Sequence, residues 1–118
     1  MFGSTAVRNT SDCAKSYALS GGGVVTVYKP FGERNYSALV KQRGRYPEGA
    51  KFARNRGRRE YSVVISGSFT YVVDGVSSVL EADDTILVGD GQRYCIDGTG
   101  TVLVMIEDQE GGATIIED

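Results

Sequence analysis

The chain has 118 residues, a length that predicts one domain with a core that buries roughly two-thirds of its unfolded surface. Its formal net charge is −2. This acidic balance argues against a nucleic-acid-binding domain, which is usually strongly basic. No run approaches the roughly 20 apolar residues of a membrane span, and the absence of histidine removes the commonest metal ligand and general base.

The two cysteines, Cys13 and Cys95, accompany a polar N-terminus that lacks the apolar stretch of a secretory signal. We therefore expect a cytoplasmic protein with reduced thiols. No spacing of cysteines and carboxylates suits a metal ion, so neither a metal nor another cofactor is expected. Charge is unevenly distributed, because eight of the 13 Lys and Arg lie between Lys41 and Arg59, and 12 of the 15 Asp and Glu lie from Glu60 onward.

Met1 to about Ala14 is polar and without a clear period, and Lys15–Leu19 is expected to be a short strand or a turn. We therefore expect a flexible N-terminal segment at 1–20, followed by the folded domain at 21–118. The glycines at 21–23 predict a turn, since a strand and not a helix follows them. Strands are expected at Val24–Lys29 and Tyr36–Gln42, with a loop between them and a turn at 43–49. A short strand at Lys51–Asn55 and a basic connection at Arg56–Arg59 follow.

The central block from Arg58 to Asp90 carries the strongest β signal. Its strands are expected at Tyr61–Ser66, Phe69–Val73, Val76–Leu80 and Thr85–Val88. Asp74-Gly75 between two of these runs predicts a type I′ hairpin, because that turn needs positive φ at both central residues.

The C-terminal third is expected to alternate short strands with turns. Strands are predicted at Arg93–Ile96, Thr101–Glu107 and Ala113–Ile116, separated by turns at Asp97–Gly100 and Asp108–Gly112. With about nine or ten short antiparallel strands and hardly any helical period, the chain is predicted to be all-β, a compact sandwich or barrel.

Two patterns in and around the central block match known motifs. Glu60, six residues and Gly67 match the second half of one motif, with Gly49 as its opening glycine; Gly91, two residues and Tyr94 match a Gly-x-x-His motif with Tyr in place of His. Over roughly Tyr36 to Ile106 the chain thus resembles the cupin superfamily. The resemblance implies a double-stranded β-helix, also called a jelly-roll barrel.

The departures from the cupin motifs bear on metal binding. The two histidine positions of the first motif fall on Ala53 and Asn55, or with a shorter gap on Arg54 and Arg56, and only Glu60 survives of the usual four ligands. Neither pair suits a divalent cation. The resemblance is therefore to small cupins that lack the metal-binding histidines, and we expect a metal-independent protein.

Strand alternation would place Ser62, Val64 and Ser66 on the same inner face as Glu60. Ligand-binding candidates at the barrel mouth are Asn55, Arg54, Arg56, Arg58 and Ser62, and the catalytic candidates are Glu60 as base and Tyr94 as acid. Each has an ordinary structural interpretation as well. The basic run could be a solvated loop or an ion-pair partner, Glu60 a salt-bridge residue, Tyr94 a packed barrel residue and Asn55 a turn residue.

Three functions follow from this set. The first is a small-molecule-binding cupin whose ligand is a sugar, a sugar nucleotide or another small anionic metabolite. The second is a carbohydrate isomerase or epimerase that uses Glu60 and Tyr94. The third is a structural module that forms a homodimer, with edge strands such as Val24–Tyr28 and Thr101–Ile106 paired across a twofold axis. No nucleic-acid or membrane partner is expected.

Overall fold

The computed structural model describes residues 14–19, 22–28 and 35–117, and the expectations for Met1–Cys13 and for the loop at 29–34 lie outside these residues. The described residues form strands and no helix, so no membrane-spanning helix occurs among them. The seven strands are β1 (Ala14–Ala18), β2 (Val24–Tyr28), β3 (Asn35–Tyr46), β4 (Phe52–Val73), β5 (Val76–Glu81), β6 (Thr85–Val88) and β7 (Arg93–Glu117).

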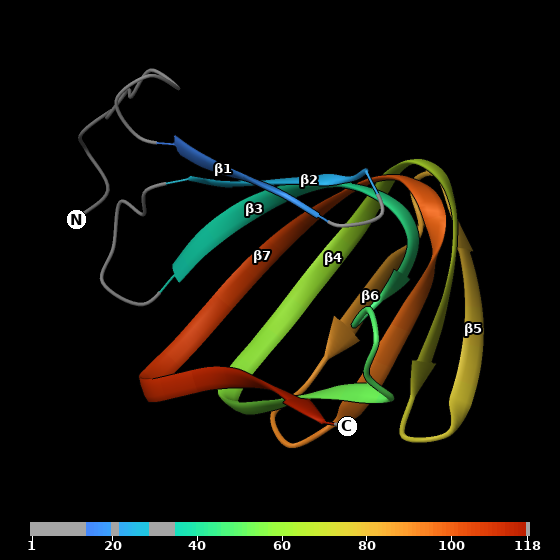
Figure 1. Cartoon of the computed structure of the whole chain (residues 1–118). Helices are drawn as coiled ribbons and strands as arrows, with labels where there is room; N and C mark the ends of the chain where they lie inside the picture. The colour runs from blue at the N-terminus through green and yellow to red at the C-terminus, as the bar shows by residue number, and fades with distance from the viewer. Residues whose placement is uncertain (1–13, 20–21, 29–34, 118) are drawn as a thin grey trace.

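All strand pairs are antiparallel, in the order β1-β2-β3-β7-β4-β5, with β6 paired to β4. The long strands β4 and β7 run side by side through the centre and bend around the barrel, while β1–β3 lie to one side and β5 to the other (Figure 1). The all-β barrel class expected from the sequence is confirmed. The strand at Ala14–Ala18 pairs with β2, so the sheet begins before residue 21.

Fewer and longer strands are present than the pattern predicts. β4 joins the segments expected at Lys51–Asn55, Tyr61–Ser66 and Phe69–Val73, and β7 joins the three segments of the C-terminal third. The turn expected at Asp97–Gly100 is wrong, because these residues pair with β4 on one side and β3 on the other. The turn expected at Asp108–Gly112 is instead a bulge in β7, opposite the interruption between Arg56 and Arg58.

Two glycines allow β4 and β7 to approach closely where these strands bend. Gly67 of β4 pairs with Gly100 of β7, and both have positive φ, 84° and 148°. A Cβ on Gly67 would lie 2.0 Å from the carbonyl oxygen of Thr99, and one on Gly100 would lie 2.1 Å from that of Ser66. Glycine is therefore required here by backbone contact within a continuous sheet, and not by chain reversal.

The hairpin between β4 and β5 is confirmed. Val73 pairs with Val76, and the intervening Asp74 and Gly75 have φ values of 47° and 81°. Positive φ at both central residues is the type I′ pattern that joins twisted strands. Asp74 also accepts a hydrogen bond from the backbone nitrogen of Arg93 at 3.0 Å, which ties the hairpin to β7.

The two strands expected at sheet edges are interior strands. β2 lies between β1 and β3, and Thr101–Ile106 of β7 lies between β3 and β4. Their backbone groups are already paired on both sides, so they cannot form an edge-to-edge dimer.

The core lies between the inner faces of the bent strands, and two bulges in β4 decide which side chains enter it. Ala53 and Asn55 are buried. An irregularity near Gly57 shifts the inward-facing positions from odd-numbered to even-numbered residues, so Ser62 and Val64 are buried on the same face as Glu60. A second irregularity, between Val64 and Ser66, shifts them back to odd-numbered residues. The buried residues of β4 beyond it are Phe69 and Tyr71, while Ser66, which was expected to face inward, is exposed.

Candidate functional site

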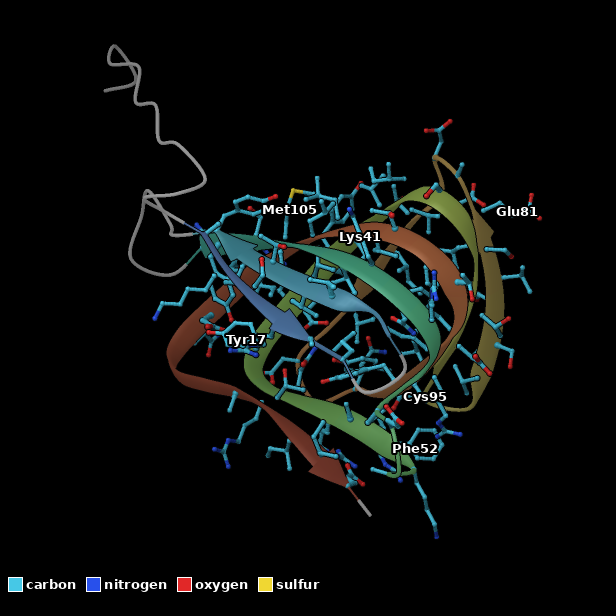
Figure 2. All side chains as sticks on the ribbon, turned by 45° about the horizontal axis from the view of Figure 1, so that its top comes forward. Tyr17, Lys41, Phe52, Glu81, Cys95 and Met105 are labelled. Atoms are coloured by element: carbon cyan, nitrogen blue, oxygen red, sulfur yellow. The ribbon has the colours of Figure 1, made fainter. Side chains whose placement is uncertain are left out.

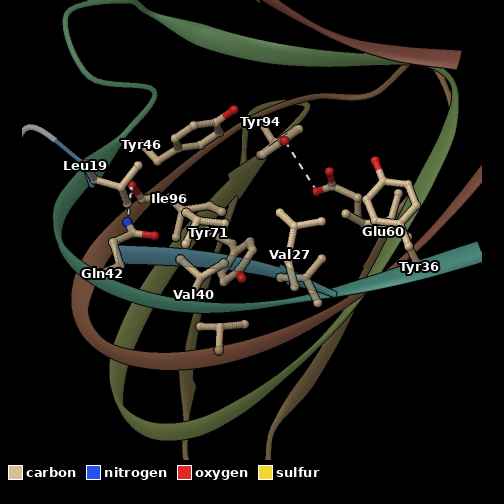
Figure 3. A pocket seen from close by; sticks show the side chains of 15 residues that line it. Leu19, Val27, Tyr36, Val40, Gln42, Tyr46, Glu60, Tyr71, Tyr94 and Ile96 are labelled. Carbon is tan, nitrogen blue, oxygen red and sulfur yellow. Dashed lines mark hydrogen bonds between the residues drawn. The ribbon is translucent and has the colours of Figure 1, made fainter. Parts of the chain in front are cut away.

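A cavity of about 230 Å³ lies inside the barrel. Its polar lining groups come from Glu60, Gln42 and four tyrosines, Tyr36, Tyr46, Tyr71 and Tyr94 (Figure 3). The other walls are aliphatic: Leu19, Val25, Val27, Ala38, Val40, Ile96, Val102, Val104 and Ile106. The cavity therefore combines a few polar groups with mostly apolar walls, which is typical of small-molecule sites.

The alternation of side chains along β2 and β3 accounts for much of this lining. The even-numbered residues of β3 from Tyr36 to Gln42 all face the cavity, as do Val25 and Val27 of β2. Tyr36 and Glu60 are both paired with Ile106 of β7, so they occupy the same transverse row of the sheet. Residues far apart in the sequence are thus aligned by register.

Glu60 and Tyr94 make the central polar contact of the cavity. The Tyr94 hydroxyl donates to Oε2 of Glu60 across 3.3 Å (Figure 3). Burial raises the pKa of Glu60 above its ordinary value, while Arg58 and the Tyr94 hydrogen bond oppose that rise. Burial and the Glu60 charge raise the pKa of Tyr94 far above 10.0, so its hydroxyl stays protonated and acts as a hydrogen-bond donor.

The other tyrosines give the cavity aromatic walls. The rings of Tyr46 and Tyr94 stack with centroids 6.4 Å apart and an interplanar angle of 30°. Burial raises the pKa of Tyr46, and it raises that of Tyr71 to about 12. These phenols are therefore neutral at physiological pH, and they offer flat ring surfaces with polar tips.

Arg58 lies beside the cavity but is already engaged. Its Nε and Nη2 donate to the two carboxylate oxygens of Asp108 at 2.5 and 3.1 Å. The guanidinium also lies 5.9 Å from the ring centroid of Tyr36. Its charge lowers the pKa of Glu60 and of Tyr94, so Arg58 influences the site electrostatically without lining it.

The remaining predicted ligand residues do not line the cavity. Arg54 donates to Oε1 of Glu117 at 2.9 Å and to the carbonyl oxygen of Gly91 at 3.1 Å, and Arg56 is exposed. Ser62 is buried and hydrogen-bonded to Tyr71, behind the cavity wall. The structure thus brings together Glu60 and Tyr94, with Arg58 adjacent, and separates them from Arg54 and Arg56.

Asn55 is fully buried, with 0% of its surface exposed, in a chain of hydrogen bonds. Nη1 of Arg58 donates to Oγ1 of Thr114 at 2.9 Å, and that hydroxyl in turn donates to Oδ1 of Asn55 at 3.1 Å. Arginine can only donate, so the Thr114 oxygen accepts from Arg58 while its proton is free for Asn55. Nδ2 of Asn55 has no hydrogen-bond partner among the described residues.

Cupins, which this chain resembles, commonly hold a metal ion, and the ligand positions of their motifs fall on four residues of this barrel. The buried pair Ala53 and Asn55 occupies the two inward positions of the first motif, while Glu60 and Tyr94 occupy the others. Ala53 has no donor atom, Asn55 supplies a neutral amide, and Tyr94 keeps its proton. One carboxylate with neutral neighbours does not fit a divalent cation.

Sequence reasoning missed Tyr36, Tyr46, Tyr71 and Gln42 as lining residues. The alternation of Tyr36–Gln42 was visible, but it does not say which face of the strand meets a cavity. Alternation counted from Glu60 makes the even-numbered residues of β4 face inward and so places Tyr71 outside. The bulge after Val64 shifts the inward positions to odd-numbered residues, which brings Tyr71 into the cavity.

No protein-family model and no curated protein matches the chain. Among solved structures, the Streptomyces protein Pac13, described as a nucleoside dehydratase, superposes with a TM-score of 0.77 at 16% identity, covering 96% of this chain and 93% of Pac13. A tyrosine-to-phenylalanine variant of Pac13 solved with uridine gives a TM-score of 0.76 at 14% identity, covering 97% of this chain and 93% of that one.

An RmlC-like cupin from Shewanella frigidimarina superposes with a TM-score of 0.67 at 19% identity, covering 89% of this chain and 91% of that one. KdgF from Halomonas gives 0.65 at 12% identity, covering 80% and 86%. The chain therefore has the cupin fold, a jelly-roll β-barrel.

Proposed function

We propose that this cupin-fold barrel binds a small, neutral, hydroxylated ring compound, with a nucleoside as the leading class. The observation that carries the proposal is the composition of the cavity. The Glu60–Tyr94 pair provides acceptor oxygens for ligand hydroxyl groups, because the Tyr94 proton is donated to Glu60, and aromatic and aliphatic side chains surround the pair. Such walls suit the faces of a ring whose polar edges are hydrogen-bonded.

The charges near the cavity favour a neutral ligand over the anion expected from the sequence. Arg58 is a nearby cation, and its guanidinium group is hydrogen-bonded to Asp108 through Nε and Nη2. Arg54 is paired with Glu117 away from the cavity, and the carboxyl of Glu60 lies inside it. A phosphate or carboxylate would meet Glu60 with no unpaired cation beside it among the residues that the structure describes, which is unfavourable in a desolvated site.

Cavity size restricts the ligand further. A volume of about 230 Å³ is below the roughly 300–1,000 Å³ typical of sites for drug-sized ligands. It suits a monosaccharide or a nucleoside better than a sugar nucleotide with its diphosphate. Pac13 is described as a nucleoside dehydratase and its variants were solved with uridine, which makes uridine the first compound to test.

The test is isothermal titration calorimetry of the protein with uridine and with a set of neutral monosaccharides. We expect saturable binding of at least one of these compounds, and weaker binding by Glu60→Gln and Tyr94→Phe. Tyr17→Phe, which changes an exposed tyrosine of β1, is the matched control and should bind as the wild type does. Binding of sugar phosphates or carboxylates in preference to neutral compounds would contradict the proposal.

A second candidate function is proton transfer on the bound ligand, favoured by the raised pKa of Glu60. A carboxylate whose pKa is moved toward neutrality is a better general base. Glu60 would remove a proton from a carbon next to a carbonyl group, and the electron pair would move onto the carbonyl oxygen. Tyr94, whose pKa is raised, would keep its proton and redirect it from Glu60 to the oxygen that gains charge.

This chemistry predicts exchange of a ligand C–H proton with solvent. Nuclear magnetic resonance of a bound ligand in D₂O would detect deuterium incorporation, and Glu60→Gln should abolish it. Exchange that persists in Glu60→Gln would exclude Glu60 as the base. Binding without any exchange would leave the barrel as a binding module.

A further inference from the structure

We propose that Gln42 determines ligand specificity by accepting a hydrogen bond from a ring N–H group at the end of the cavity away from Glu60. The inference rests on the proposed function, because it names the base that a nucleoside ligand would carry. A lactam ring such as uracil, which has an N–H between two carbonyl groups, is the chemical class selected.

The orientation of the Gln42 amide is set by the backbone around it. Nε2 donates to the carbonyl oxygen of Gly44 at 2.8 Å and approaches that of Ile96 at 3.5 Å. A flipped amide would place its oxygen against two carbonyl oxygens, which is repulsive. Oε1 is consequently directed away from these carbonyl groups.

Oε1 of Gln42 faces the cavity (Figure 3). Only 6% of the Gln42 surface is exposed, and no donor among the described residues is paired with this oxygen. Oε1 is not one of the fully buried polar atoms that lack a partner, so it is accessible from the cavity. A ligand that fills the cavity and supplies a donor keeps this oxygen hydrogen-bonded, whereas an acceptor or an apolar group would leave it unpaired.

Gln42 and Glu60 lie on opposite sides of the cavity (Figure 3). Tyr36, which shares the row of Glu60, is six positions before Gln42 on β3, so the two groups lie at different positions along the curved strand. The site therefore has two separate polar ends. The Glu60 end offers the oxygens of a carboxyl group and of a phenol whose proton is donated to that carboxyl, whereas the Gln42 end offers one amide oxygen.

The surroundings of Gln42 favour a flat ring over a second polyol. Leu19, Val40 and Ile96 line the cavity on this side, with the ring of Tyr46 nearby (Figure 3). A sugar placed here would satisfy one hydroxyl at Oε1 and leave the others against aliphatic carbon, which costs free energy. A planar heterocycle buries its faces against these walls and presents one N–H to Oε1.

The deciding experiment compares uridine with 3-methyluridine by titration calorimetry on the wild-type protein. Methylation removes the N–H donor and keeps the rest of the nucleoside. We expect 3-methyluridine to bind at least roughly tenfold more weakly. In Gln42→Met, which keeps the length of the side chain but not the acceptor, the preference for uridine should shrink by about the same factor. Gln109→Met, at an exposed position of β7, should keep the wild-type preference.

Equal binding of the two nucleosides by the wild type, or binding of monosaccharides only, would overturn this inference and leave the proposed function standing. An undiminished preference in a folded Gln42→Met would also overturn it. If neither nucleosides nor monosaccharides bind, the proposed function itself is wrong and the role of Gln42 fails with it. The wild-type comparison needs no variant, so it decides the question even if Gln42→Met does not fold.

Discussion

The hydroxyl of Tyr94 lies 3.3 Å from Oε2 of Glu60, and both side chains face the cavity of the barrel. Tyr94 is on β7 and Glu60 is on β4, 34 residues earlier in the chain. Burial favours the protonated form of the carboxyl, whereas this hydrogen bond and Arg58 favour the ionised form. The protonation of Glu60 is thus set by identifiable neighbours, and each of them can be changed.

Removing the Tyr94 hydroxyl should raise the pKa of Glu60 further. In Tyr94→Phe the carboxylate loses a donor that lowers its pKa, while burial remains. The measurement is a carbon-13 titration of the glutamate side-chain carboxyl signals in the two proteins. A Glu60 pKa that stays the same or falls in Tyr94→Phe would show that this hydrogen bond does not stabilise the carboxylate in solution.

Glu60 should make the protein less stable as the pH rises. Its pKa in the folded state is raised above the ordinary 4.5, so the folded state holds the proton more tightly than the unfolded state does. The contribution to the free energy of unfolding is therefore complete below about pH 4.5 and is lost as the pH rises through the folded-state pKa.

Glu60→Gln removes this loss, so the variant should be more stable than the wild type at pH 8, and the gap should close toward pH 4. Urea denaturation at the two pH values measures it. Glu81→Gln, which changes an exposed carboxylate on β5 (Figure 2), is the control and should not alter the pH dependence. A Glu60→Gln variant that is less stable than the wild type at pH 8 would contradict the prediction.

The half-buried Arg58–Asp108 pair should matter more to stability than the exposed Arg59–Glu107 pair next to it. The side chains of the first pair are 18% and 22% exposed, and those of the second are 56% and 54% exposed. Arg58→Met removes the cationic donor of Asp108 and the donor of Thr114, leaving Asp108 with its Tyr36 hydrogen bond, and we expect a loss of about 2–4 kcal/mol. Arg59→Met should cost less than about 1 kcal/mol. Similar losses measured by denaturation in both variants would argue against this difference.

Gly100 should tolerate no side chain. In Gly100→Ala the new Cβ would lie 2.1 Å from the carbonyl oxygen of Ser66, so the β4–β7 corner would have to open. Gly44→Ala is the matched control, because Gly44 also has positive φ, 87°, but nothing lies within 4 Å of its Cβ position. We expect roughly 1 kcal/mol of strain in the control and failure to fold, or a loss of several kcal/mol, in Gly100→Ala. Equal thermal stability of the two variants would refute the steric explanation.

The outer face of the sheet suggests how a homodimer would form. Tyr61 of β4 is paired with Leu87 of β6 and Met105 of β7, and all three side chains are exposed in one row. Figure 2 shows Met105 pointing away from the barrel. A contiguous apolar row of this kind is typical of an interface between subunits.

We expect light scattering coupled to size-exclusion chromatography to show a dimer that Leu87→Glu converts to a monomer. Val79→Glu is the control, since it places the same charge on the exposed β5 strand outside this row. A wild-type protein that is monomeric at high concentration would remove the dimer from consideration.

Much of the fold could be read from local pattern. Asp74-Gly75 between β-branched runs specified a two-residue hairpin, because few other dipeptides accept positive φ at both positions. Alternation marked Tyr36–Gln42 as a strand with one apolar face. Gly98 and Gly100 led to the wrong prediction of a turn at Asp97–Gly100. Glycine marks a turn in the hairpin, but it also occurs where two strands come within contact distance, as it does here.

The sequence by itself determined the all-β class, the hairpin at Asp74-Gly75, the cupin-like spacing of Glu60 and Tyr94, and the loss of the metal-binding histidines. These depend on residue types and short-range geometry. Only the tertiary structure decided which side chains share the cavity. Two bulges in β4 change its inward parity, and the register of β3 and β4 on β7 brings Tyr36 into the row of Glu60. Long-range contacts also pair Arg54 with Glu117 and Arg58 with Asp108. Such pairings arise from contacts between strands far apart in the chain, which no local pattern encodes.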